Sequence, residues 1–323
     1  MKKVFISGRI PVEAKEKLAQ HFAVTAYEGE GLISEKELVE GITDAEGLLC
    51  LLSDAVSQEI MAQAPHLKII ANYGAGFNNI DVMAATERKI PVTNTPLVST
   101  NATADMTWAL ILGIARRVVE GDKLTRAGGF TGWAPLFHLG VEVTGKTLGI
   151  FGMGNIGKAV ARRAKGFEME ILYHSRTRLN VEEEKELGAR YVSFEELLTE
   201  SDFLTLHSSY SPELHHLLSW EEFRKMKKSA FLINAARGPM VDEAALAEVL
   251  KAKEIAGAGL DVYEFEPKVA ESMMALNNVI LAPHLGNATV ETRAAMAEIA
   301  ANNIIEVLNG RQALNCVNPA VYG

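Results

Sequence analysis

The chain has 323 residues, of which 48% are hydrophobic, and its formal net charge is −9. This length is enough for two domains with sizeable cores, and a net acidic chain is a poor binder of nucleic acid. No apolar stretch is long enough to span a membrane, so no membrane partner is expected. The first residues, Met1 to Ile6, mimic a signal peptide, but Ser7-Gly8-Arg9 ends the apolar run and predicts a strand instead.

The chain has two cysteines, Cys50 and Cys316, with no C-x-x-C motif and no metal-ligand spacing. So few cysteines are typical of proteins in a reducing compartment. We therefore expect two core thiols, no metal site and a cytoplasmic location.

Short apolar runs alternate with helical patterns along the whole chain, as in parallel sheets that are covered on both faces. This alternation predicts a βαβ architecture. The predicted strands are Val4–Ser7, Gly47–Leu51, Lys68–Ala71, Val92–Asn94, Thr147–Phe151, Glu170–His174, Phe203–Leu206, Ala230–Asn234, Gly257–Leu260 and Val279–Leu281. The clearest helical patterns lie at Glu13–His21, Ser34–Gly41, Asp105–Val119, Glu243–Ala252 and Val290–Leu308.

A glycine-rich segment follows the predicted strand Thr147–Phe151. Gly152, Gly154 and Gly157 have the G-x-G-x-x-G spacing, and helical character begins at Ile156. The first glycine permits a tight turn, the second lets the backbone approach a pyrophosphate, and the third lets helix and strand pack closely. The N-terminus of the helix also offers free N–H groups to phosphates. The segment therefore predicts a dinucleotide site.

The end of the next strand, Glu170–His174, indicates which dinucleotide is preferred. An NAD site places Asp or Glu there, to accept hydrogen bonds from the ribose hydroxyls. This chain has Ser175-Arg176-Thr177-Arg178 instead, so two guanidinium groups can bind a 2′-phosphate that no carboxylate repels. We expect NADP(H) to be preferred, with NAD(H) possible. A solvated basic loop is the alternative interpretation.

The position of the dinucleotide motif predicts the domain organisation. It begins near residue 147, too late for a protein with one nucleotide-binding domain. We therefore expect residues 1–99 and 291–323 to form a split substrate-binding domain with a flavodoxin-like sheet, and residues 100–290 to form an inserted NAD(P)-binding Rossmann domain. The expected fold class is α/β, with two doubly wound Rossmann-like domains and a ligand cleft between them.

Three polar segments follow predicted strands of the second domain. Arg237, the acids from Asp261 to Glu266, and His284 each come shortly after a buried strand. Polar groups at the carboxyl ends of parallel strands face the ligand crevice. An arginine can bind a carboxylate, a histidine can act as general acid, and an acid can hold the imidazolium. Together they predict a hydride-transfer site, although each alone could be a helix cap, a loop charge or a strand-end histidine.

These segments resemble the D-2-hydroxyacid dehydrogenases, and the resemblance covers nearly the whole chain. Residues 234–246 look like the arginine segment of that family, residues 260–267 like its acid segment, and residues 283–286 like its histidine segment. The separations of 29 residues from Arg237 to Glu266 and 18 residues from Glu266 to His284 also fit.

The resemblance assigns a role to each of these residues. It implies that Arg237 binds the substrate, that Glu266 supports the histidine and that His284 is the acid–base group. It also implies that Asp261 contacts the nicotinamide carboxamide. Glu264 has no catalytic role in this interpretation, because the acid of the family directly precedes the proline.

The first domain carries further matches. Residues 72–81 resemble the glycine loop of the family, in which Tyr73, Gly74, Ala75 and Gly76 would hold the substrate carboxylate through a nest of backbone N–H groups. An ordinary turn is the alternative interpretation of that loop. Residues 102–105 resemble the start of the cofactor-facing helix, where Thr103 is the expected contact.

Within the family, the chain is most similar to the glyoxylate/hydroxypyruvate reductases. Residues 128–136 resemble their dimerisation loop, whose Trp133 could reach the substrate site of a partner subunit or simply pack in the dimer interface. One departure lies at residues 207–214, where Ser209 stands in place of a proline and Leu214 in place of a common threonine. Phosphoglycerate dehydrogenases are less similar, since many carry an arginine where this chain has Asn72.

The resemblance implies an NADP(H)-preferring reductase that forms a homodimer and converts glyoxylate to glycolate and hydroxypyruvate to D-glycerate. One alternative is a reductase of a larger 2-keto acid such as 2-ketogluconate. Another is a dinucleotide sensor similar to the corepressors that share this fold. The expected cofactor contacts are Thr103, Gly152, Met153, Gly154, Asn155, Ile156, Gly157, Ser175, Arg176, Thr177, Arg178, His207, Ser208, Ala235, Ala236, Asp261 and Gly286.

Overall fold

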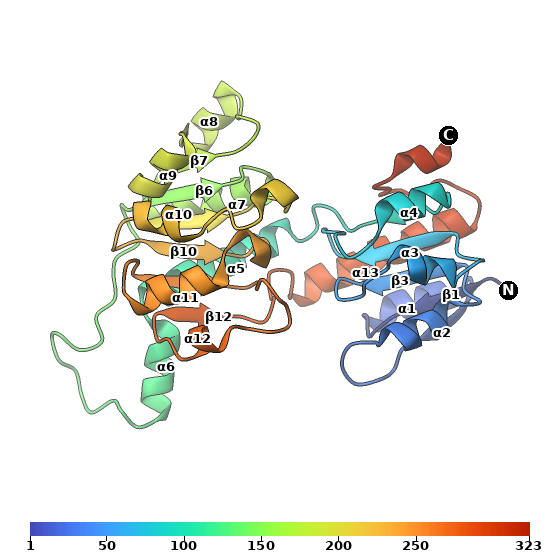
Figure 1. Ribbon diagram of the computed structural model, residues 1–323, viewed down its shortest axis with the longest axis horizontal. Coiled ribbons are helices and arrows are strands. Elements are labelled where there is room, and N and C mark those ends of the chain that lie inside the picture. Colours follow the sequence, from blue (N-terminus) through green and yellow to red (C-terminus); the bar gives the residue numbers. More distant parts are fainter. The chain divides into compact units, whose positions relative to one another are not determined.

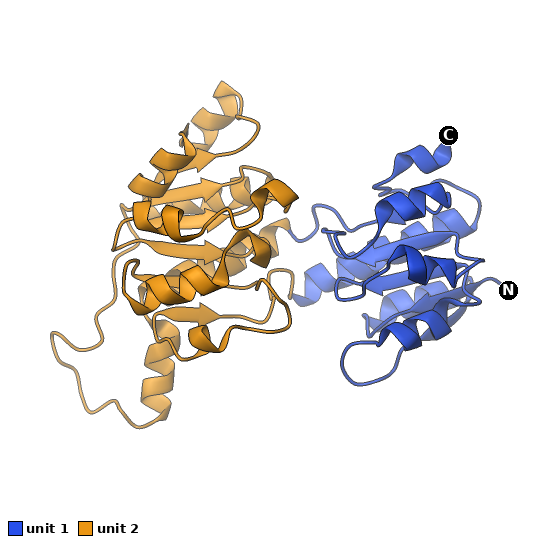
Figure 2. Cartoon of the chain, in the orientation of Figure 1, with its two compact units in different colours: residues 1–99, 289–323 blue, residues 100–288 orange.

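A computed structural model describes all 323 residues, and the chain divides into two compact units. Unit 1 comprises Met1–Ser99 and Thr289–Gly323, and unit 2 comprises Thr100–Ala288 (Figure 2). Unit 1 is therefore formed by both ends of the chain, and unit 2 is the segment between them. The second boundary lies two residues before the one expected at residue 290.

Unit 1 is built on a five-stranded parallel sheet with the order β2-β1-β3-β4-β5. This is the flavodoxin-like order, as predicted. Alternate residues of a strand point to opposite faces, so Val4 and Ile6 of β1 pack on one face and Phe5 on the other. The strands are β1 (Lys3–Ile6), β2 (Ala23–Ala26), β3 (Gly47–Leu51), β4 (Ile69–Tyr73) and β5 (Val92–Thr93).

Two sets of helices cover this sheet (Figure 1). Helices α1 (Val12–Ala19) and α13 (Val290–Leu308) share one core with the strands, although they come from opposite ends of the chain. The other face packs on α2 (Glu35–Ile42), α3 (Gln58–Ala62) and α4 (Val82–Glu87). A short 3-10 helix, Pro319–Tyr322, lies near the C-terminus. Because α13 shares this core, the C-terminal segment is an integral part of unit 1.

Unit 2 is built on a seven-stranded parallel sheet with the order β12-β11-β10-β9-β6-β7-β8. The chain builds outward from β6 to β8 and then from β9 to β12 in the opposite direction, so the order reverses between β6 and β9. Ligands of such sheets bind outside the carboxyl ends of the strands at this reversal. The strands are β6 (Thr147–Phe151), β7 (Glu170–His174), β8 (Ala189–Tyr191), β9 (Phe203–Leu206), β10 (Phe231–Asn234), β11 (Gly257–Leu260) and β12 (Val279–Leu281).

Helices cover both faces of the second sheet as well (Figure 1). One core contains α5 (Thr100–Ala115) and α7 (Asn155–Ala164), and the other contains α9 (Phe194–Glu200), α10 (Trp220–Lys225) and α11 (Glu243–Lys251). The remaining helices are α6 (Val118–Arg126), α8 (Val181–Leu187), α12 (Glu271–Met274) and the 3-10 helices η1 (Lys165–Phe167), η2 (Pro212–Leu214) and η3 (Gly238–Met240). None of the helices of the chain combines the length and apolar character that crossing a bilayer requires.

Two differences between the observed and the predicted elements go beyond a shift of an element's ends. Strands β2 and β8 were not predicted, and both lie at sheet edges, where half-exposed residues replace the buried apolar runs. The helix predicted over 105–119 is interrupted at Arg117, whose φ of 54° is left-handed. The guanidinium of Arg117 donates to Glu120 and to the carbonyl of Leu139, which stabilises a break that no glycine or proline signals.

Candidate active site

The predicted acid–base residues lie at the carboxyl ends of three adjacent strands. Arg237 follows β10, Asp261 follows β11, and His284 comes three residues after the end of β12. These strands are parallel neighbours in the sheet, so their carboxyl ends share one edge. The edge therefore brings together residues that lie up to 47 positions apart in the sequence.

His284 forms a direct pair with Glu266. The Nδ1 atom of His284 lies 2.8 Å from Oε2 of Glu266, and each side chain is 36% exposed. Because a carboxylate only accepts hydrogen bonds, Nδ1 carries the proton and Nε2 is left to exchange one with a ligand. Burial acts to raise the pKa of Glu266, but the hydrogen bond and charge of His284 outweigh it and lower that pKa, so Glu266 is ionised at neutral pH.

The loop that carries Glu266 is held by three hydrogen bonds. The Tyr263 N–H donates to the other carboxylate oxygen of Glu266 at 3.0 Å, and the Tyr263 hydroxyl donates to the Ala282 carbonyl at 2.8 Å. The Glu264 N–H donates to the buried carboxylate of Glu243 at 2.5 Å. These bonds fix the distance between the loop after β11 and the segment after β12, and hence the position of Glu266 beside His284.

Asp261 accepts hydrogen bonds from the backbone that follows His284. It is 1% exposed, and its two carboxylate oxygens accept the N–H groups of Leu285 at 2.6 Å and Gly286 at 2.7 Å. Burial raises the pKa of Asp261, and these two N–H groups counteract part of that rise. A side chain added at Gly286 would come within 3.5 Å of Thr103, so three of the expected cofactor contacts, Thr103, Asp261 and Gly286, lie together.

Arg237 is a mostly buried cation without an anionic partner. Its Nη1 donates to the Ala236 carbonyl at 2.7 Å, and no carboxylate lies within ion-pair distance of the guanidinium. Burial lowers the pKa of Arg237, while the negative charge of Glu266 acts in the opposite direction. A buried charge without a partner is costly, so the site is suited to an anionic ligand. The preceding Ala235 and Ala236 are both buried.

The glycine motif combines a tight turn, close helix–strand packing and open space at the start of α7. Gly152 has φ = 97°, and a Cβ there would lie 2.6 Å from the Ser208 nitrogen. A Cβ on Gly157 would collide with the Gly152 carbonyl, which confirms the close packing of β6 and α7. Gly154 is the N-cap of α7, and nothing lies within 4 Å of where its Cβ would be. Open space at this glycine, next to the N–H groups of Asn155 and Ile156, fits a dinucleotide phosphate.

The two arginines of the loop after β7 are in different situations. Arg178 forms a bidentate pair with Glu184, with bonds of 2.8 and 3.0 Å, and Glu184 also accepts the Tyr173 hydroxyl at 2.7 Å. The bond from Arg178 is the largest cause that lowers the pKa of Glu184 to about 2. Arg176 is exposed and forms no ion pair, and Ser175 donates to the Thr177 carbonyl. Arg176 is therefore the arginine of this loop that is free to meet a phosphate.

His207 and Ser208 begin the loop after β9, next to the glycine turn. Both ring nitrogens of His207 are buried without a hydrogen-bond partner, and burial lowers the pKa of this histidine to about 3. The ring is therefore neutral at physiological pH. The Ser208 hydroxyl donates to the Ser209 carbonyl at 3.2 Å, and Met153 of the glycine motif is buried.

In the glycine loop of unit 1, the carbonyl groups are hydrogen-bonded and the N–H groups are left unbonded. The carbonyl of Gly74 accepts the Thr95 N–H, while those of Ala75 and Gly76 accept the side-chain amides of Asn94 and Asn72. The N–H groups of residues 74–76 form no backbone hydrogen bond. This arrangement is an anion nest in form. The Tyr73 hydroxyl instead donates to the Arg293 carbonyl at 2.7 Å, so it serves the packing of α13 on β4.

Two residues that support the site were not predicted from the sequence. Glu243 begins α11 with its carboxylate directed to the Glu264 N–H, and Tyr263 connects two loops through its backbone and its hydroxyl. Both lie in the segments that carry predicted site residues, 234–246 and 260–267, but an acid at a helix start looks like an ordinary helix-dipole partner. Only the tertiary contact reveals that Glu243 holds the loop that carries Glu266.

Comparisons with known proteins give the family. The family model for the NAD-binding domain of D-isomer specific 2-hydroxyacid dehydrogenases matches residues 108–286. A putative 2-hydroxyacid dehydrogenase of Staphylococcus haemolyticus is 53% identical over 318 residues, which cover 98% of this chain and 100% of that protein.

Solved structures agree over the whole length. A protein of Thermus thermophilus has 41% identity and a TM-score of 0.93, with coverage of 98% of this chain and 99% of that one. An NADPH-dependent glyoxylate/hydroxypyruvate reductase of Sinorhizobium meliloti, solved with NADP and malonate, has 31% identity and a TM-score of 0.84, with coverage of 99% and 97%. The chain therefore belongs to the D-isomer specific 2-hydroxyacid dehydrogenases, oxidoreductases whose NAD-binding domain corresponds here to unit 2.

Proposed function

We propose that the protein is an NADP(H)-preferring reductase of small 2-keto acids, with glyoxylate and hydroxypyruvate as its substrates. The observation that carries the cofactor preference is the loop after β7, which has no carboxylate at the strand end and one exposed, unpaired guanidinium at Arg176. Charge-assisted bonds from arginine to phosphate are strong and directional. The name of the Sinorhizobium meliloti reductase gives further support, because that protein is described as NADPH-dependent and was solved with NADP.

The cofactor preference is tested by comparing the two arginines. Arg176→Ala should lower kcat/KM with NADPH by about 10- to 100-fold and leave kcat/KM with NADH within about twofold, since a charge-assisted bond contributes about 1.5–3 kcal/mol. Arg178→Ala is the matched control, because its guanidinium is already bound by Glu184. An unchanged NADPH-to-NADH ratio in Arg176→Ala would contradict the assignment.

We propose that His284 and Arg237 carry the reduction, with Glu266 as the supporting group. A nicotinamide dinucleotide, when bound, supplies the hydride that attacks C2 of the keto acid. His284 donates the proton on Nε2 to the carbonyl oxygen, and Glu266 stabilises the imidazolium that this requires. Arg237 binds the carboxylate of the substrate and polarises the carbonyl. Within unit 1, the N–H groups of residues 74–76 are a proposed binding site for a carboxylate.

The substrate is identified by a panel of 2-keto acids at fixed NADPH. Glyoxylate and hydroxypyruvate should give higher kcat/KM than pyruvate or 2-ketogluconate, which absorbance at the NADPH band measures directly. Turnover confined to 2-ketogluconate would instead indicate the larger-substrate alternative. Tight NADPH binding without turnover of any keto acid would refute the reductase function and favour a dinucleotide sensor.

We also propose that the protein is a cytoplasmic homodimer. The segment from α6 to residue 142 carries several exposed apolar side chains, and Trp133 is 85% exposed. Large exposed apolar groups in one segment are typical of protein interfaces. Light scattering should give twice the chain mass of 35.1 kDa, and Trp133→Ala should weaken the dimer. A monomeric wild type at micromolar concentration would exclude this arrangement.

The two unpaired cysteines support a reducing compartment.

A further inference from the structure

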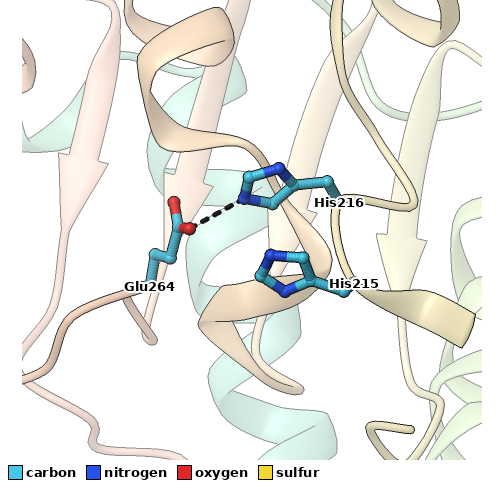
Figure 3. Close-up of side chains that lie close together, drawn as sticks. All are labelled: His215, His216 and Glu264. Carbon is cyan, nitrogen blue, oxygen red and sulfur yellow. Dashed lines mark hydrogen bonds and ion pairs between the residues drawn. The ribbon is translucent and has the colours of Figure 1, made fainter. Parts of the chain in front are cut away.

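A histidine pair after η2 lies beside Glu264, apart from the residues that the proposed reaction uses (Figure 3). Nε2 of His216 is 2.7 Å from Oε1 of Glu264, and the rings of His215 and His216 stack with centroids 4.1 Å apart. Each of the three residues offers a ligand atom, and these atoms lie within 4.8 Å of one another. Two neutral imidazoles and a carboxylate form a donor set that is common in transition-metal sites.

The backbone explains why two neighbouring histidines share one side of the chain. In extended chain, successive side chains point in opposite directions. His215 has extended dihedral angles, but His216 has φ = 51°, in the left-handed region, and this change of hand brings its ring over that of His215. The His216 N–H is held by the Pro239 carbonyl at 2.9 Å. The pair is thus set by the fold of the segment.

We propose that His215, His216 and Glu264 form a site for a divalent transition metal ion, for which Zn²⁺ is the probe. The ion would replace the proton between His216 and Glu264. Their ligand atoms are 2.7 Å apart and would have to separate to about 3.3 Å, the distance that zinc bonds of about 2.0–2.1 Å give at a tetrahedral angle. His215 is exposed, so its ring can rotate out of the stack to supply the third bond. A water would complete a tetrahedral shell.

Polar groups lie beside the second nitrogen of each ring. Oδ2 of Asp242 lies 4.0 Å from Nδ1 of His216, so a carboxylate faces the ring nitrogen that points away from Glu264. Ligating histidines commonly have a carboxylate on this side of the ring. At 4.0 Å Asp242 is too far for a hydrogen bond, so it acts on His216 through its charge. The Tyr210 hydroxyl lies 3.4 Å from Nδ1 of His215, which leaves Nε2 of that ring to bind an ion.

The site is separate from the His284–Glu266 pair, but it shares the loop between Tyr263 and Glu266. Glu264 turns to His216 and not to His284, and its N–H is held by Glu243. No sequence pattern indicates this site, because Glu264 is 48 residues from His216 and adjacent histidines match no common ligand spacing. The proposal does not depend on which keto acid the enzyme reduces.

Calorimetric titration of the metal-free full-length protein with ZnCl₂ tests the proposal. The wild type should bind one Zn²⁺ per chain at neutral pH. Glu264→Gln keeps an oxygen that can accept from His216 but removes the charge, and His216→Asn retains a residue that tolerates positive φ. Each should weaken binding by about tenfold or more, and His215→Ala should do so too. Circular dichroism verifies the fold of each variant.

Two histidine variants serve as controls. His66→Ala removes an exposed imidazole of unit 1, and His284→Ala removes the other histidine that is paired with a carboxylate. Both should bind Zn²⁺ as the wild type does. The proposal is overturned if the wild type binds no Zn²⁺, if Glu264→Gln and His216→Asn bind it unchanged, or if His284→Ala abolishes binding. None of these readouts uses catalytic activity.

Discussion

Replacing Glu266 by glutamine should slow ketone reduction by at least about tenfold. The lost interaction joins Oε2 of Glu266 to Nδ1 of His284 at 2.8 Å. Hydrogen bonds of charged groups contribute about 1.5–3 kcal/mol, and because both side chains are 36% exposed, solvent screening favours the lower value. About 1.5 kcal/mol corresponds to roughly tenfold in rate. Glutamine also has one oxygen for two donors, since the Tyr263 N–H binds the same carboxylate.

The prediction for Glu266→Gln is tested by steady-state NADPH oxidation with glyoxylate, with kcat measured across pH. The hydrogen bond and the charge of His284 lower the pKa of Glu266, because the carboxylate and the imidazolium stabilise each other. Without this carboxylate, the alkaline fall of kcat should move to lower pH. Glu271→Gln, an exposed acid at the start of α12, is the matched control and should behave as the wild type. A kcat within twofold of the wild type and an unshifted pH profile would refute the role given to Glu266.

Three other perturbations have distinct expected outcomes. Arg237→Ala should raise KM for the keto acid and lower kcat/KM by at least about 100-fold, because the guanidinium has no other anion to bind. NADPH affinity, measured by fluorescence, should be unchanged. A loss of NADPH affinity would argue against this role. Gly157→Ala should lower the melting temperature, because the new Cβ would collide with the Gly152 carbonyl. Gly154→Ala should leave the melting temperature unchanged and weaken only NADPH binding, because nothing lies near its Cβ position. Equal melting temperatures for the two variants would contradict this prediction. Glu184→Gln should be less stable than the wild type at neutral pH. The folded protein lowers the pKa of Glu184 to about 2, so the ionised carboxylate stabilises the fold above the pKa of the unfolded chain, and this stability is lost as the pH falls from about 4.5 toward 2. The difference in melting temperature should therefore shrink over that range, and a constant difference would contradict the prediction.

The strands of the central sheets could be predicted because their local patterns are unambiguous. β6, β7, β9 and β11 begin and end at the predicted residues, since a buried parallel strand is a continuous apolar run. The family and the doubly wound fold are likewise confirmed. β2 and β8 lack this signal, because an edge strand exposes one side and its composition approaches that of a loop.

Contacts within the loops could not be predicted, because they depend on how separate elements pack. The Ser175–Arg178 segment suggests two phosphate-binding arginines, yet Arg178 is bound by Glu184 of the following helix. The sequence spacing does not distinguish a free arginine from a paired one. Both arginines are exposed, and whether Arg178 reaches Glu184, six residues later, depends on the conformation of the loop. The proposed preference for NADP(H) therefore depends on Arg176 alone, whereas the sequence suggests that two arginines contribute to it.

The proposed acid–base residues were predicted from their motifs, but the groups that hold their loops in place are buried carboxylates. Asp261 accepts two backbone N–H groups beyond His284, and Glu243 accepts that of Glu264. Burial raises the pKa of both acids, which shows that each carboxylate is kept in an environment that disfavours its charge. Backbone N–H groups satisfy these acids without adding a mobile side chain. Because Asp261 directly follows β11 and Glu243 begins α11, the separation of His284 and Glu266 is set by the rigid sheet edge.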